Sequence, residues 1–149
     1  MIVHSGSVER TRELGRILGT SANAGTVVIL IGELGAGKTT FTQGLGEALG
    51  VGEPVTSPTF VVAREHRGER VDLVHVDAYR VHSLHEWDDL DLDYENAVFV
   101  VEWGDRVLVA LPEDHLEVRF QLDDDARTLE FTARGPASRA LLAAFEAAT

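Results

Sequence analysis

The eight residues from Gly32 to Thr39 read Gly-Glu-Leu-Gly-Ala-Gly-Lys-Thr, which is the spacing of a loop that holds the phosphates of a nucleoside triphosphate. Glycine has no Cβ, so the backbone of such a loop can turn tightly and point successive N–H groups at an anion. Lys38 supplies a positive charge for the β- and γ-phosphates, and the Thr39 hydroxyl is a hard oxygen ligand for Mg²⁺. The pattern therefore predicts a site for a nucleotide and magnesium.

The segments on either side of the loop have the order that this chemistry requires. Residues 26–31, Thr-Val-Val-Ile-Leu-Ile, form an apolar run typical of a strand that is buried on both faces. After the loop, Phe41, Leu45 and Leu49 recur at helical spacing, and Gly50 is a natural helix end. The positive end of this helix dipole would face the phosphates. The order of strand, loop and helix favours nucleotide binding over a glycine-rich turn with an incidental Lys-Thr pair.

Two acidic residues end apolar strands and are candidates for the chemistry. Glu102 follows residues 97–101, at the position where nucleotide hydrolases keep an acid for Mg²⁺; the alternative is an ordinary solvated carboxylate. Asp77 ends the apolar segment 71–76 and could order an attacking or magnesium-bound water, or else cap a helix or pair with Arg80. Ligands of open α/β sheets bind at the carboxyl ends of the strands, so both acids are expected beside the loop.

The periodicity of the remaining chain predicts the elements that position these residues. Further helices are expected over residues 8–19 with Ser7 as the cap, within 83–95, and over 136–148. Further strands are expected on either side of a turn at Gly68, and as an antiparallel hairpin over 116–122 and 128–134. The sum is an α/β fold in which a mixed parallel and antiparallel sheet is flanked by helices in a three-layer sandwich.

The composition excludes several classes of protein. A chain of 149 residues suits one domain over residues 1–149. The formal net charge of −12 disfavours direct binding of nucleic acid, which needs clustered Lys and Arg. The sequence has no cysteine, so disulfides and thiolate metal sites are excluded. Neither a secretory signal at the start nor an apolar run of membrane-spanning length is present, and we expect a cytoplasmic protein with no membrane association.

Four segments, taken together and in this order, make the chain resemble the TsaE family of small bacterial ATPases. They are Gly32–Phe41, Ser57–Phe60, His75–Arg80 and Val101–Trp103. The resemblance covers nearly the whole chain. It implies a P-loop NTPase-like fold that binds ATP with Mg²⁺ and hydrolyses it slowly. It also implies a role in threonylcarbamoyladenosine modification of tRNA, in complex with the proteins TsaD and TsaB, which would hold the tRNA themselves.

The resemblance also implies roles for particular residues. Those expected to contact ATP are Thr11, Gly35, Ala36, Gly37, Lys38, Thr39, Thr40 and Arg127. Thr39 and Glu102 are expected to hold Mg²⁺, and the expected catalytic residues are Asp77, Glu102 and Lys38. Thr59 would lie in a switch-like segment, and Trp103 near the site.

Two other functions share the phosphate-binding loop. The first is a small-molecule kinase, for example for a nucleoside, in which Asp77 is the acceptor base and Arg80 a phosphate clamp. The chain offers no obvious arginine-rich lid for it and little length for an acceptor pocket. The second is a nucleotide-dependent switch that acts only by binding partners. Phosphoryl transfer to water is the favoured reaction, because Lys38 and the loop amides would neutralise charge while Asp77 or Glu102 orders water.

Overall fold

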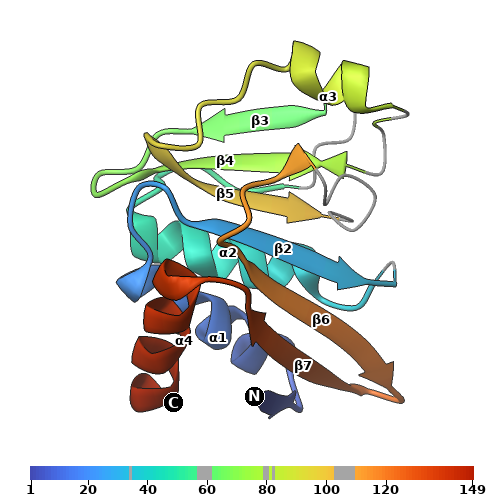
Figure 1. The fold of residues 1–149 in the computed structure, drawn as a ribbon. Coiled ribbons are helices and arrows are strands. Elements are labelled where there is room, and N and C mark those ends of the chain that lie inside the picture. The colour runs from blue at the N-terminus through green and yellow to red at the C-terminus, as the bar shows by residue number, and fades with distance from the viewer. Residues whose placement is uncertain (34, 57–61, 79–80, 82, 103–109) are drawn as a thin grey trace.

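The computed structural model describes residues 1–149 except residues 34, 57–61, 79–80, 82 and 103–109. Among the described residues, seven strands form one sheet in the order β1-β7-β6-β2-β5-β4-β3 (Figure 1). The strands are β1 Ile2–Ser5, β2 Val27–Gly32, β3 Ala63–His66, β4 Asp72–Asp77, β5 Ala97–Glu102, β6 Leu116–Asp123 and β7 Ala126–Ala133. Strands β6, β2, β5 and β4 run parallel, and antiparallel strands extend the sheet at both edges. The predicted mixed sheet is confirmed.

Helices cover both faces of this sheet, as the three-layer prediction requires. The described helices are α1 Val8–Ser21, α2 Lys38–Leu49, α3 Leu84–Asp89 and α4 Pro136–Ala148. Alternate strand residues point to opposite faces, so one apolar cluster packs sheet residues such as Leu30 and Val100 against α1, α2 and α4. A second cluster packs residues such as Ile29 and Val101 against Trp87 of α3 and against apolar residues that follow this helix in the sequence. The site-bearing helix α2 therefore lies on the more heavily covered face.

The ends of the helices are set by residues that are neighbours in sequence and, at α4, by a residue that is distant in sequence. Ser7 caps α1 as predicted, because its hydroxyl accepts a hydrogen bond from the Arg10 N–H at 3.1 Å. The end of α2 at Leu49, before Gly50, is also as predicted. Helix α4 is capped by a residue that precedes it by more than twenty positions. The Asp114 carboxylate accepts hydrogen bonds from the backbone N–H groups of Ala137 and Ser138 in the first turn, at 2.7 and 2.9 Å. Burial alone would raise the pKa of Asp114, but hydrogen bonding by the Ser138 side chain, these two backbone hydrogen bonds and the charge of Arg139 outweigh it, and the pKa lies below the ordinary value.

Strand β1 was not among the predicted elements. Its four residues pair antiparallel with β7, with Ile2 opposite Glu130 and Ser5 opposite Arg127. Four residues are too few to show a reliable period of two, and the partner strand lies more than a hundred positions away in the chain. The strand places Ser5 beside the start of α1, where its hydroxyl lies 2.8 Å from that of Thr11.

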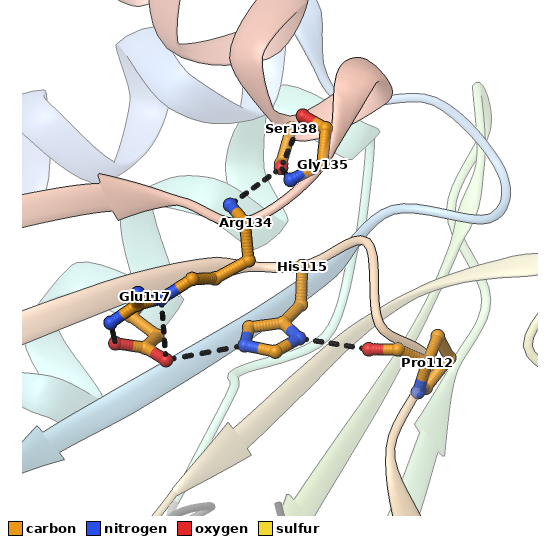
Figure 2. A network of polar contacts seen from close by, with 6 residues as sticks. All are labelled: Pro112, His115, Glu117, Arg134, Gly135 and Ser138. Atoms are coloured by element: carbon orange, nitrogen blue, oxygen red, sulfur yellow. Dashed lines mark hydrogen bonds and ion pairs between the residues drawn. The ribbon is translucent and has the colours of Figure 1, made fainter.

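An ionic network around the buried side chains of His115 and Glu117 joins the start of β6 to the end of β7 (Figure 2). The guanidinium group of Arg134 donates to both oxygens of Glu117 at 3.2 Å, and His115 Nε2 lies 3.2 Å from Glu117 Oε1. The other ring nitrogen of His115 lies 2.8 Å from the Pro112 carbonyl oxygen. Burial alone would raise the pKa of Glu117, but the hydrogen bonds and charges of Arg134 and His115 outweigh it and lower that pKa.

This network predicts a specific loss of stability in acid. A carboxyl with a lowered folded-state pKa stabilises the fold above its ordinary pKa of 4.5, and this contribution is lost as the pH falls through the folded-state value. We expect Glu117→Gln to lower the free energy of unfolding by about 1.5 kcal/mol at pH 7, because Arg134 loses a charged partner but is itself half-exposed. The difference from wild type should shrink below pH 4.5 in urea titrations followed by circular dichroism. Glu113→Gln, at a nearby exposed position, should show no such difference.

Candidate nucleotide site

The glycine loop between β2 and α2 has the backbone that its sequence predicts. Gly35 and Gly37 have φ values of 81° and 102°, which side chains other than glycine rarely adopt. At Gly32 a Cβ would come within 2.8 Å of the Phe120 carbonyl oxygen on β6. The glycines are therefore required by the turn itself and by the close approach of the neighbouring strand.

Lys38 begins α2 and lies inside the loop. Its side chain is buried, and Nζ donates to the carbonyl oxygens of Gly32 at 2.5 Å and Glu33 at 3.1 Å. Burial lowers the pKa of Lys38, while the carboxylates of Glu102 and Asp77 oppose this by favouring the ammonium form. The loop thus surrounds an amine whose charge is stabilised by two predicted catalytic acids.

Those two acids lie side by side at the carboxyl ends of the parallel strands. Asp77 at the end of β4 is the register partner of Glu102 at the end of β5, and Glu102 is also paired with Leu30 on β2. Glu102 is only 4% exposed, so the alternative of a solvated strand-end carboxylate is wrong. Asp77 is half-buried. The strand-end rule therefore brings Lys38, Asp77 and Glu102 to one place.

The structure also brings Thr11 and Arg127 to the loop, although neither is close to it in sequence. The Arg127 guanidinium group donates to the Gly35 carbonyl oxygen at 3.2 Å. Thr11 on α1 lies against Gly37, where a Cβ would be 3.4 Å from the threonine methyl carbon. The Thr11 hydroxyl is 2.8 Å from that of Ser5. Their predicted contacts with ATP remain predictions, and the structure shows that both residues contact the loop.

The remaining predicted ATP contacts lie at the start of α2. Gly37 is the N-cap, and no side chain of the described residues caps this helix end. Ala36 is buried, and Thr39 and Thr40 are half-buried in the first turn. The N-terminus of a helix is a suitable binding site for an anion when no side chain accepts hydrogen bonds from its N–H groups. Thr59, Trp103 and Arg80 lie outside the described residues.

Sequence reasoning missed two residues that touch this site. Ser5 was missed because strand β1 was not predicted. The sequence pattern assigned no role to His75, yet its Nε2 lies 2.8 Å from Glu102 Oε2 and its side chain is fully buried. The available signal was its position two residues before Asp77 on the same strand, which places both side chains on one face.

By fold and loop, the chain is an α/β protein of the P-loop type. It belongs to the TsaE family: the profile described as "Threonylcarbamoyl adenosine biosynthesis protein TsaE" matches residues 5–129. The tRNA threonylcarbamoyladenosine biosynthesis protein TsaE of Streptomyces coelicolor is 57% identical over 113 residues, covering 72% of this chain and 76% of the relative. The Bacillus subtilis protein of the same name is 38% identical over 131 residues, covering 85% and 82%.

A solved structure supports the same assignment. The crystal structure of Bacillus subtilis YdiB superposes with a TM-score of 0.81 at 30% identity, covering 99% of this chain and 95% of that one. The family and the α/β fold are therefore shown, and with the family comes a role in tRNA threonylcarbamoyladenosine biosynthesis. None of the described helices has the length and apolar character needed to cross a membrane.

Proposed function

We propose that the chain is a single-domain cytoplasmic ATPase that binds ATP with Mg²⁺, hydrolyses it slowly and supports threonylcarbamoyl transfer to tRNA in complex with TsaD and TsaB. The observation that carries the proposal is the meeting of Lys38, Asp77 and Glu102 against the glycine loop. A buried cation that lies beside two acidic residues and the N-terminus of a helix is an arrangement suited to phosphoryl transfer. The net charge of −12 supports the view that the partners, rather than this chain, hold the tRNA.

The residues at the site fit both ATP and magnesium. The backbone N–H groups of residues 35–40 would hold the phosphates, with Lys38 as the cationic partner. Thr11, which lies against Gly37, and Arg127, which donates to the Gly35 carbonyl oxygen, would complete the nucleotide site. Thr39 and Glu102 would hold Mg²⁺ through a hydroxyl and a carboxylate, which are the hard oxygen donors that this ion prefers. No group of three or more His, Asp or Glu side chains within the described part of the chain could hold a metal ion. Magnesium is ordinarily held by one or two protein oxygens together with substrate phosphates, so the donor set is sufficient.

The chain's own groups account for hydrolysis as follows. Lys38 Nζ would exchange its carbonyl contacts for phosphate oxygens and neutralise the charge that develops on them. Asp77 would accept a hydrogen bond from the attacking water and orient it. Mg²⁺ held by Thr39 and Glu102 would supply further neutralisation of the phosphate charge. Slow turnover by the chain alone is expected, with partners supplying the acceleration.

Phosphate release tests this proposal. ATP and Mg²⁺ are incubated with the chain alone and with purified TsaD and TsaB, and inorganic phosphate is measured. We expect release to be slow alone, faster with the partners, and lost in Glu102→Gln. Release that is indifferent to the partners would argue against the tRNA-modification complex. Transfer of the phosphoryl group to a nucleoside would show a kinase, and normal support of modification without turnover would show a switch.

A further inference from the structure

His75 lies on β4 behind the site, where it contacts Glu102 from the protein interior. Its side chain is 0% exposed and Glu102 is 4% exposed, and the distance from Nε2 to Oε2 is 2.8 Å. The register explains the contact, because His75 precedes Asp77 by two residues and Asp77 is paired with Glu102. Two polar side chains are thus buried together on the face of the sheet that helix α2 covers.

The surroundings of His75 determine which ring nitrogen carries the hydrogen. A carboxylate only accepts hydrogen bonds, so the contact with Glu102 requires an N–H at Nε2. The other nitrogen, Nδ1, is buried and has no hydrogen-bond partner among the described residues. An N–H at Nδ1 would be a buried donor without an acceptor, which is more costly than an unpaired lone pair. A ring with its hydrogen on Nε2 is therefore the form that fits these contacts.

We propose that His75 is a positioning residue for Glu102. This inference rests on the proposed function, in which Glu102 is a ligand of Mg²⁺. The Nε2–H group of His75 donates to Oε2 of Glu102, which holds the carboxylate in one orientation and leaves Oε1 as the ligand atom. Without this donor the buried carboxylate would lose the hydrogen bond at Oε2 and could turn away from the loop. His75 touches neither substrate nor metal in this scheme and acts only through Glu102.

Two substitutions separate positioning from packing. His75→Leu introduces an apolar side chain of similar bulk and removes the donor, whereas His75→Gln keeps an N–H at about the position of Nε2. ATP binding is measured at equilibrium by displacement of a fluorescent ATP analogue, in EDTA and over a series of Mg²⁺ concentrations. We expect His75→Leu to raise the Mg²⁺ concentration for half-maximal binding by about 10-fold or more, with metal-free affinity unchanged. His75→Gln should recover most of this loss.

His66→Leu is the matched control. His66 is a second histidine on this side of the sheet, 1% exposed, with Nδ1 2.6 Å from Glu53 and Nε2 also without a described partner. It lies on β3 and does not contact Glu102, so its loss should leave the Mg²⁺ dependence unchanged. Equal loss in His75→Leu and His75→Gln, or loss in His66→Leu, would show that packing alone is responsible and would overturn the proposal.

Glu102→Gln distinguishes failure of this proposal from failure of the proposed function. If Glu102→Gln does not change the Mg²⁺ dependence, the metal assignment itself is wrong. If Glu102→Gln changes it and His75→Leu does not, only the positioning role is wrong. Should His75→Leu not fold, ¹⁵N NMR of the wild-type protein without nucleotide still tests the geometry. A hydrogen on Nε2 supports the proposal, and a ring whose only hydrogen is on Nδ1 overturns it.

Discussion

Lys38→Met is expected to lower the rate of ATP hydrolysis by about 10²–10³-fold, the effect of removing one preorganised charge-stabilising group. Methionine has nearly the length of lysine and keeps the packing, so the lost charge is the main change. Lys38 is buried beside Glu102 and Asp77, where a charge interacts more strongly with phosphate than it would in water. Lys38→Ala should be equally inactive. Phosphate release measures the loss, and a melting temperature close to that of wild type would show that the fold is intact.

The same residue allows a direct test of nucleotide binding. Lys38 is the only lysine in the sequence, so an amine-reactive reagent can modify only its side chain and the amino group of Met1. ATP with Mg²⁺ should protect Lys38 from modification, as measured by mass spectrometry of the peptides. The Met1 amino group contacts the Phe131 carbonyl oxygen on β7 and provides an internal control, because its modification should not change. Unchanged modification of Lys38 at saturating ATP would be incompatible with the proposed site.

The fold could be predicted wherever the signal was local. The apolar run before the loop, the alternation of the 116–134 hairpin and the Ser7 cap each depend on residues that are neighbours in sequence, and the structure has all three. Strand β1 and the Asp114 cap of α4 depend instead on partners that are distant in sequence. Periodicity carries no information about such pairs, which is why both were missed.

The residues of the candidate site also differ in whether the sequence pattern could predict them. The loop pattern and the acids at two strand ends were predicted from residue types and the topology of parallel sheets, and the structure brings Lys38, Asp77 and Glu102 together. Thr11 and Arg127 were expected only through the resemblance, since no local pattern links them to the loop. The contact between His75 and Glu102 was missed because it needs the register of β4 against β5.

Gly44→Ala is expected to lower the free energy of unfolding by about 3 kcal/mol, the upper part of the range for overpacked sites. Helices α1 and α2 meet at glycines: a Cβ on Gly44 would overlap the Arg12 carbonyl oxygen, and one on Gly15 would overlap that of Phe41. These are backbone atoms, so the helices would have to separate. Helix propensity alone predicts the opposite sign, because alanine in a helix is favoured over glycine by about 1 kcal/mol. The clash is the larger effect.

Gly46→Ala is the matched control on the same helix. There a Cβ would be 3.1 Å from a methyl carbon of Val55, a side-chain atom that can move, so the net change should be below about 1 kcal/mol. Thermal unfolding followed by circular dichroism should show Gly44→Ala melting about 10 °C lower than wild type and Gly46→Ala near it. Gly44→Ala should also weaken ATP binding, because α1 carries Thr11 and α2 begins at Lys38. Equal melting temperatures for the two variants would mean that the spacing of α1 and α2 does not limit stability.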